Sequence, residues 1–324
     1  AVALRDVGFD QMGTPLVTLS PSGTLAYESA AATTRHLVWV SRQGIEEPVT
    51  DAVRPYQSPR LDSTHQRIVV ENAGDIWVHD LGRQSFTRLT SGSTLGNGYP
   101  ALSPDGSRIV FRTLFGMHVL STDGGGAPVL LPGTGTGDFP TSVSPDGQRV
   151  IFIRQNVPTT SDIFETPLDG SGAPQPLLMT NTNEGGGMFS PDGRWFSYSM
   201  TEGGRYDVFA RPYHGADKRI PVSARGGIQA RWSPAGKELF YRDGDRMMVV
   251  DVRASANELV LSTPRVLFER RYSFGPGQSQ PNYDVSADGQ RFLMVKEDWP
   301  AGRLSVVLNW TEELRRLTSA PERR

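Results

Sequence analysis

Short apolar segments recur along the chain, and each follows a turn-forming tetrapeptide at the same distance. The tetrapeptide Ser103–Gly106 reads Ser-Pro-Asp-Gly and precedes the apolar run Arg108–Phe111. Ser144–Gly147 repeats the same four residues and precedes Arg149–Phe152. Apolar runs of about four to eight residues, bounded by Gly and Pro, are typical of strands. The pattern therefore predicts pairs of strands joined by tight hairpins.

The composition of the tetrapeptide explains why it forms a turn. Proline presets φ at about −65° for the first central position, and glycine accepts the positive φ that closes the turn. Serine and aspartate side chains bond to nearby backbone N–H groups and hold the bend. The apolar run after each turn is then the next strand.

The same unit recurs along the whole chain. Copies begin near residues 20, 62, 103, 144, 190, 233 and 286, and the copy at 62 keeps little more than its downstream apolar run. A spacing of about 40–45 residues is typical of a four-stranded propeller blade. We predict an all-β, seven-bladed β-propeller of four-stranded antiparallel blades over residues 1–310, with a short C-terminal tail over 311–324. Six blades, with one copy aberrant, is the alternative.

The rest of each copy supplies further strands and packing residues. A third strand often opens with an aspartate, as at Asp75, Asp162 and Asp207. Aromatic residues recur at a fixed distance after the turn, and we expect them to pack between adjacent sheets. These aromatic residues are Phe111, Phe152, Tyr198 and Tyr241.

We expect the two ends of the chain to close the ring together. The last copy has room for three strands, near residues 281–286, 290–296 and 304–309, and the sequence after Leu308 is more helical than extended. The missing fourth strand would be an N-terminal strand near Val2–Val7. Such an exchange removes two exposed sheet edges.

Charge and composition narrow the classes of partner. The chain has 33 basic and 35 acidic residues, a net charge of −2 and no cysteine. We therefore expect no nucleic-acid partner, no disulfide and no thiolate metal site. No apolar run is long enough to cross a bilayer, so we expect no direct membrane insertion. The absence of cysteine suits a periplasmic or extracellular protein, which is the predicted location.

Motifs for catalysis are missing from the sequence. There is no Gly-x-Ser-x-Gly elbow and no His-Glu-x-x-His pair. The histidines fall at unrelated phases of the repeat; they are His36, His65, His79, His118 and His214. Asp243–Asp245 (Asp-Gly-Asp) is interpreted as a hairpin turn and not as a calcium loop. We predict no catalytic residue, no cofactor and no metal.

One group of residues remains as a candidate binding site. In a propeller the first strand of each blade lines the central channel, and its start reaches the channel mouth. Residues before each turn would then contact a ligand, because they combine aromatic platforms with charges of both signs. The predicted ligand-binding residues are Arg54, Tyr56, Asn97, Tyr99, Asp138, Phe139, Glu184, Gln229, Arg231, Asn282 and Tyr283.

The repeat resembles the TolB-type Pro-Asp (WD-like) propeller repeats in three features. These are the Ser-Pro-Asp-Gly turn, the apolar run with its preceding Arg, and the third strand that begins with an aspartate. The segment Val306–Leu314 is similar to the ends of the C-terminal propellers of bacterial serine/threonine protein kinases. This likeness implies a sensor domain of a larger bacterial signalling protein. It also implies an attached kinase domain, which this sequence does not contain.

Three functions follow as hypotheses. The first is a non-catalytic module that binds a protein, peptide or glycan ligand at the channel mouth. The second is a propeller enzyme, a lyase, lactonase or glycosidase, in which Asp138 and Glu184 face each other across the opening. The third is a structural scaffold, whose partner docks on the blade edges.

Overall fold

The structure is a computed structural model of the 324-residue chain. It describes residues 17–28, 34–92, 96–156, 160–215, 218–255, 258–275, 280–298 and 304–318. The chain divides into two compact units, Ala1–Arg35 with Glu297–Arg324 and His36–Lys296. Among the described residues, no helix is long and apolar enough to cross a membrane.

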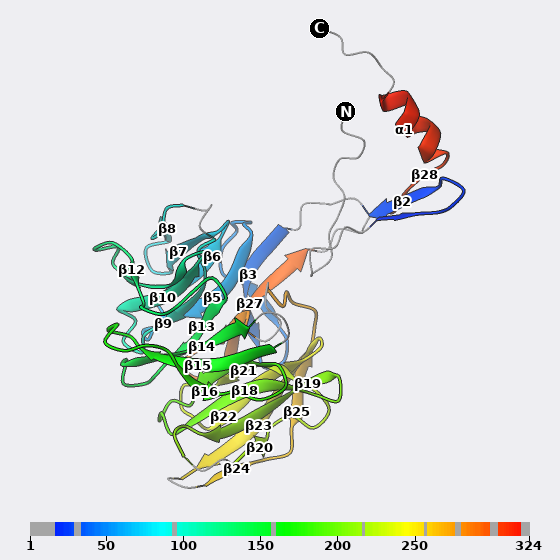
Figure 1. Cartoon of the computed structure of the whole chain (residues 1–324). Helices are drawn as coiled ribbons and strands as arrows, with labels where there is room; N and C mark the ends of the chain where they lie inside the picture. Colours follow the sequence, from blue (N-terminus) through cyan, green and yellow to red (C-terminus); the bar gives the residue numbers. More distant parts are fainter. Residues whose placement is uncertain are drawn as a thin grey trace. The chain divides into compact units, whose positions relative to one another are not determined.

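The second unit consists of antiparallel sheets whose strands follow one another in sequence (Figure 1). The first three sheets hold β5 (Tyr56–Leu61), β6 (Arg67–Asn72), β7 (Asp75–Asp80) and β8 (Ser85–Arg88); β9 (Gly98–Leu102), β10 (Arg108–Thr113), β11 (Gly116–Ser121) and β12 (Val129–Leu130); β13 (Asp138–Val143), β14 (Arg149–Asn156), β15 (Thr160–Pro167) and β16 (Gln175–Leu178). The next two hold β17 (Glu184–Phe189), β18 (Trp195–Glu202), β19 (Arg205–Pro212) and β20 (Ile220–Pro221); β21 (Ile228–Trp232), β22 (Glu238–Asp243), β23 (Arg246–Ala254), β24 (Leu259–Leu261) and β25 (Arg265–Glu269).

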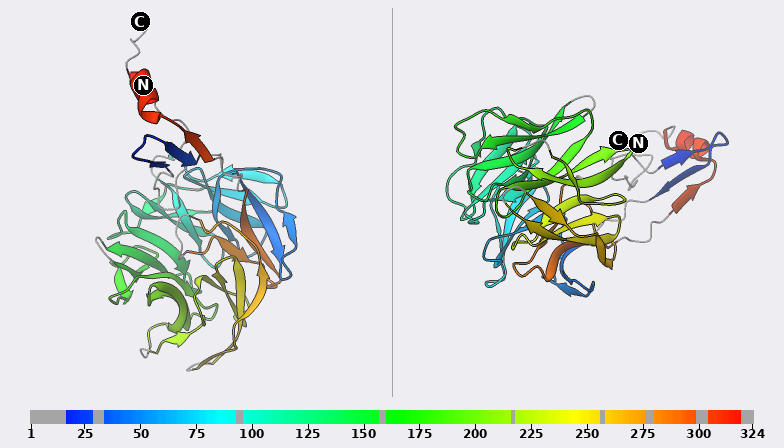
Figure 2. Two further views of the ribbon diagram at one scale, coloured as in Figure 1. Left: turned by 90° about the vertical axis from the view of Figure 1, so that its right-hand side faces the viewer. Right: turned by 90° about the horizontal axis from the view of Figure 1, so that it is seen from below.

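The sixth sheet joins the two ends of this unit. It has the order β26 (Tyr283–Val285), β27 (Arg291–Asp298), β3 (Thr34–Ser41) and β4 (Glu46–Pro48). The inner strands β5, β9, β13, β17 and β21 contact one another in turn, and β26 contacts β5. An ion pair between Arg231 and Asp284 links β21 to β26. The sheets therefore surround a central axis, as Figure 2 shows, and the unit is a β-propeller.

The structure confirms an all-β fold of four-stranded antiparallel sheets but not seven blades. Within the described residues the propeller unit holds six sheets, as the alternative prediction had it. The copy at Ser20 forms the expected turn, in which the Gly23 N–H donates to the Ser20 carbonyl at 3.0 Å. Its strands β1 (Val17–Leu19) and β2 (Leu25–Glu28) instead pair with β28 (Leu304–Val307) in a separate three-stranded sheet. All three residues of β1 are exposed, the apolar Val17 and Leu19 included, so in this sheet they do not pack into the core of a blade.

The closing strands also differ from the prediction. The segment expected to be the third strand of the last blade is β28, which lies in the first unit and leads into helix α1 (Trp310–Thr318). The blade is completed by two N-terminal strands, β3 and β4, and not by one. The predicted strand near Val2–Val7 falls outside the described residues. An N-terminal contribution to closure is therefore confirmed, but from a later part of the chain.

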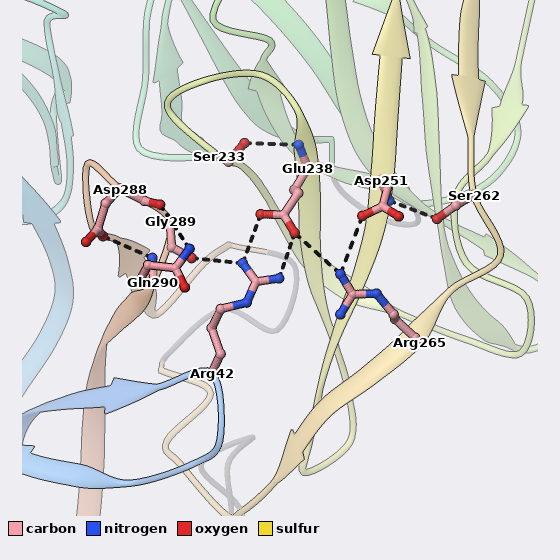
Figure 3. A network of polar contacts seen from close by, with 9 residues as sticks. All are labelled: Arg42, Ser233, Glu238, Asp251, Ser262, Arg265, Asp288, Gly289 and Gln290. Atoms are coloured by element: carbon pink, nitrogen blue, oxygen red, sulfur yellow. Dashed lines mark hydrogen bonds and ion pairs between the residues drawn. The ribbon is translucent and has the colours of Figure 1, made fainter.

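A polar network fixes the closing hairpin to its neighbour, as Figure 3 shows. Arg42, in the turn between β3 and β4, donates to both carboxylate oxygens of Glu238 at 2.9 and 2.6 Å and to the Gly289 carbonyl at 3.0 Å. Arg265 of β25 approaches the same carboxylate at 3.5 Å. Paired N–H donors in a planar guanidinium give such bonds a defined geometry. The last blade is thus held to the fifth by directed contacts as well as by apolar packing.

The core lies between adjacent sheets, where each blade covers the apolar face of the next. One cluster joins Val110 and Met117 of the second sheet to Val150 and Phe152 of the third. The recurring aromatic residues are all buried, with exposed fractions of 1% or less. Their predicted packing between sheets is confirmed.

The hairpin turns have the predicted chemistry. In the copy at 144, the Arg149 N–H donates to the Ser144 hydroxyl at 2.9 Å, the Gln148 N–H donates to Asp146 at 3.0 Å, and Gly147 has a φ of 70°. The copy at 62 reaches the same shape with other residues. The Asp62 carboxylate accepts the Gln66 and Arg67 N–H groups, and His65 has a φ of 54° in place of glycine.

Candidate functional site

The channel has two ends with different chemistry. We call the end where the inner strands begin the start face, and the end where they run into the hairpin turns the hairpin face. The predicted ligand-binding residues were placed at the start face. Most of them are buried there, with exposed fractions of 3% or less for Tyr56, Asn97, Asp138, Glu184, Gln229, Asn282 and Tyr283.

The polar side chains of the start face bond to the protein itself. Arg154 of β14 donates to both oxygens of Asp138, at 2.8 and 2.7 Å. The Asn97 amide donates at 3.0 Å to Asp75, the first residue of the third strand in the preceding sheet. This aspartate also accepts from Thr90 at 2.9 Å. The Asn97–Asp75 bond joins neighbouring blades, whereas the Asp138–Arg154 pair lies within one sheet. Both satisfy polar groups that would otherwise be buried without partners.

Glu184 occupies the position of Asn97 two sheets further on, and there it meets a second acid. Its Oε1 accepts from Thr182 at 3.1 Å and from Thr180, whereas its Oε2 has no hydrogen-bond partner. Burial raises its pKa, and the neighbouring carboxyl of Asp162 raises it further. A second negative charge beside Asp162 is costly under burial, so Glu184 keeps its proton to a higher pH than a free glutamate does.

A loop segment packs onto the start face above the last two inner strands. The Phe274 carbonyl accepts from the Gln229 side chain at 2.8 Å, and the Ser273 carbonyl accepts from Asn282 at 3.1 Å. Arg242, which is 2% exposed, donates to the Ser273 and Tyr272 carbonyls. These polar residues are therefore also used in the fold.

Three predicted residues remain partly open at this face. Arg54 is exposed and lies over the ring of Phe86 at 4.8 Å. The half-buried rings of Tyr99 and Phe139 meet edge to face, with centroids 5.0 Å apart. Binding at the start face stays a prediction.

Arg231 lies apart from the rest of the predicted set, because it lines a cavity at the hairpin face. This cavity has a volume of about 240 Å³. All six inner strands contribute to it, and Pro104, Pro191 and Pro234 of the hairpin turns lie at its rim. An axial cavity walled by every blade is a position that the fold itself creates.

One position of the repeat supplies a wall residue from every blade. It lies two residues before the first residue of each turn. The occupants, in blade order, are Arg60, Ala101, Ser142, Met188, Arg231 and Asp284, and all of them line the cavity. A β-bulge stands just before this position in β5, β9, β13, β17 and β21. Bulges re-aim the side chain that follows, which explains the common direction toward the axis.

The six occupants divide the cavity into two halves. Arg231, Asp284 and Arg60 come from β21, β26 and β5, which are neighbours in the ring. Ala101, Ser142 and Met188 come from β9, β13 and β17 on the other side. The next residue of each inner strand is apolar all round the ring and also lines the wall; these residues are Leu61, Leu102, Val143, Phe189, Trp232 and Val285. One half therefore carries the charged groups, and the other has only uncharged side chains.

Arg60 and Asp284 were missing from the predicted site, although the sequence contained a signal for them. The prediction followed the starts of the inner strands, whereas the cavity lies near their ends. Comparing the residue two before each turn would have placed the charged residues Arg60, Arg231 and Asp284 in one register. Among the described residues, no group of three or more His, Asp or Glu could hold a metal ion.

Comparison with known proteins supports the fold. No family model matches the chain. It is 28% identical over 260 residues to the uncharacterized protein Atu1656 of Agrobacterium fabrum, covering 74% of this chain and 84% of that one. A TolB-like protein of Agrobacterium tumefaciens superposes with a TM-score of 0.67 and 18% identity, over 83% of this chain and all of the other. The fold is that of the TolB-like propellers.

Enzymes share this propeller fold. An oligogalacturonate lyase, solved with manganese, superposes with a TM-score of 0.54 and 14% identity over 95% of this chain and 83% of its own. A gluconolactonase of Xanthomonas campestris superposes with a TM-score of 0.52 and 16% identity, over 86% of this chain and 99% of its own. Identities this low establish architecture and carry no activity across.

Proposed function

We propose that this chain is a non-catalytic binding module that takes a small ligand in the axial cavity from the hairpin face. The observation that supports the proposal most is the repeat position two residues before each turn, which lines one cavity from all six inner strands. About 240 Å³ corresponds to roughly eight water molecules. The cavity therefore suits a small molecule, or a single group projecting from a peptide or glycan.

The enzyme alternative receives less support from the geometry. It relied on Asp138 and Glu184 as opposed carboxylates. Arg154 occupies both oxygens of Asp138, and Glu184 is buried against Thr180, Thr182 and Asp162. A general acid or base must reach a reactant to transfer its proton. Asp138 is instead paired within its own sheet, and Glu184 lies against Asp162 of the preceding sheet.

The proposal extends to the role of the whole protein. The likeness of Val306–Leu314 to the ends of kinase-linked propellers suggests a sensor or interaction module of a larger bacterial signalling protein, acting in the periplasm or outside the cell. In such a module, a ligand that spans the axial cavity would contact all blades at once and change their relative stability. Binding would then be transmitted through the ring as a whole.

The test is a screen for small ligands combined with a variant that fills the cavity. Ala101→Met places at this position the residue that the fourth blade already has there, Met188, and removes cavity volume. Ala173→Met, on an exposed loop, adds the same atoms outside the cavity. Compounds that raise the melting temperature of the wild type should also stabilise the Ala173→Met variant but not the Ala101→Met variant.

Two results would contradict this proposal. Ligands that stabilise both variants equally would bind outside the cavity. Ligands recovered as reaction products after incubation, as judged by mass spectrometry, would indicate an enzyme. Unchanged ligands with binding lost in the Ala101→Met variant would support a non-catalytic module.

A further inference from the structure

We infer that the ligand of the axial cavity is a small organic acid, whose carboxylate bonds to Arg60 while its apolar part faces the opposite wall. This inference rests on the proposed binding function and specifies the ligand class. It follows from the state of the charged half of the cavity, where two arginines lie beside one aspartate.

Asp284 is fully engaged. One oxygen forms the ion pair with Arg231 and accepts the Val285 N–H at 2.8 Å, and the other accepts the Leu61 N–H at 2.9 Å. This carboxylate therefore neutralises Arg231 and also fixes the ends of two inner strands. Its negative charge also acts on Arg60 and raises the pKa of that guanidinium, but both of its oxygens are already used by other groups.

Arg60 is buried without a counterion of its own. It is 4% exposed, its Nη1 donates to the adjacent Pro59 carbonyl at 2.8 Å, and its Nε has no hydrogen-bond partner. Burial and, to a smaller extent, the positive charge of Arg231 lower the pKa of the guanidinium to about 9, although the charge of Asp284 raises it. Arg60 is therefore still a cation at neutral pH. A buried cation needs a paired anion to offset its loss of hydration, which costs several kcal/mol.

The other ionisable groups of the wall do not fill this role. Asp62, at the rim, pairs with Arg67 at 3.0 Å and accepts the backbone N–H groups of its own turn. His65 contributes a buried Nδ1 without a hydrogen-bond partner, which is a further polar group available to a ligand. The charged half thus has one more positive than negative group near Arg60.

The ligand class follows from the two halves together. A guanidinium presents N–H donors in a planar fork that matches a carboxylate. The facing wall of Met188, Phe189 and Val143 excludes water from a hydrocarbon group, which favours its burial. An organic acid satisfies both halves, whereas an inorganic oxyanion satisfies only one.

The experiment compares acids with their neutral amides. The probes are butyrate, succinate and benzoate, each beside its amide, with sulfate and phosphate as inorganic anions, titrated by calorimetry into the whole chain. At least one acid should bind the wild type about tenfold or more tightly than its amide, because a hydrogen bond to a charged group contributes about 1.5–3 kcal/mol. Arg60→Met should lose that preference, and Arg60→Lys should keep part of it.

Controls separate this inference from the proposed function. Arg83→Met removes an exposed arginine outside the cavity and should leave acid binding unchanged. Equal binding of acids and amides, or acid binding that survives Arg60→Met, would overturn the ligand class while cavity binding, tested by Ala101→Met, could still stand. Binding of sulfate or phosphate as tight as that of the best organic acid would replace the organic ligand with an oxyanion. No binding of any organic acid would also count against the inference.

Discussion

The two faces of the channel contain similar residues in opposite situations. At the start face, Asp138 and Arg154 form a bidentate pair, and Asn97 bonds to Asp75 of the preceding blade. At the hairpin face, Arg60 is as deeply buried but bonds to one backbone carbonyl. Polar residues in a channel are therefore not by themselves a binding site. The informative feature is a buried charge whose bonds the protein has not used.

The comparison predicts opposite responses to the same substitution. Removing an arginine at the start face should cost stability, since it leaves a partner without its counterion. Removing Arg60 at the hairpin face should cost ligand binding, since no protein carboxylate depends on it for its counterion. The variants below test this contrast in order of their expected effect on folding.

Arg154→Met should have the largest effect. It leaves Asp138 buried and unpaired, with its side chain 2% exposed, so we expect the free energy of unfolding to fall by about 3–5 kcal/mol in urea denaturation. Arg194→Met, which breaks an exposed pair with Asp192, should cost about 0–1 kcal/mol. Equal losses in the two variants would show that Asp138 does not depend on its partner, and the start face would no longer be a structural network.

Gly147→Val should have the next largest effect, because it disturbs a turn that supports the hairpin face. Gly147 has a φ of 70°, and a β-branched residue there costs about 1–3 kcal/mol. Gly147→Asn should cost less, since asparagine tolerates this conformation. Chemical denaturation of both variants measures the difference. A valine variant as stable as the asparagine variant would mean that the turn is not under this constraint.

Much of the fold could be predicted because turn chemistry is local. Ser144, Asp146 and Gly147 form their hairpin from contacts within a few residues, and the copies at other positions do the same. Blade membership is not local. The turn at Ser20 forms as predicted, yet its strands pair with β28 from the other end of the chain, and the local sequence does not encode that partner.

The candidate site was harder to predict for a related reason. Asn97 and Glu184 are polar residues at channel positions, and their sequence does not say whether the neighbouring blade supplies a partner. Asp75 and Asp162 supply those partners from the preceding sheet. Arg60 belongs to no recognisable sequence motif. It becomes a candidate only in the folded chain, where the bulge before it and the order of the blades place it beside Arg231 and Asp284.

Glu184→Gln tests the pKa of a start-face carboxyl and should change the free energy of unfolding less than the two variants above. The raised pKa of Glu184 keeps it protonated in the folded state after the unfolded chain has ionised. Wild-type stability should therefore fall as the pH rises from the ordinary glutamate pKa of 4.5 through the raised value. The glutamine variant lacks this fall, so its advantage should be absent near pH 4 and reach about 1 kcal/mol above the raised pKa.

Asn97→Asp is the matched variant for this prediction. It places a second carboxyl against Asp75, as Glu184 lies against Asp162, and should introduce the same loss of stability with rising pH. Melting temperatures measured from pH 4 to 8 compare both variants with the wild type. Parallel curves for Glu184→Gln and the wild type would mean that the pKa of Glu184 is not raised in the folded state.

Arg60→Met should have the smallest effect on folding, and it tests the contrast most directly. Asp284 keeps its ion pair with Arg231, so the substitution leaves no carboxylate without a counterion. Methionine adds apolar contacts beside the wall and removes a desolvated cation, and replacing buried ionic groups with apolar ones is often neutral or stabilising. We expect the unfolding free energy to change by about 0.5 kcal/mol, because the protein bond that is lost is the one to the Pro59 carbonyl. A loss as large as that of Arg154→Met would make Arg60 a structural residue like those of the start face, and the two faces would no longer differ.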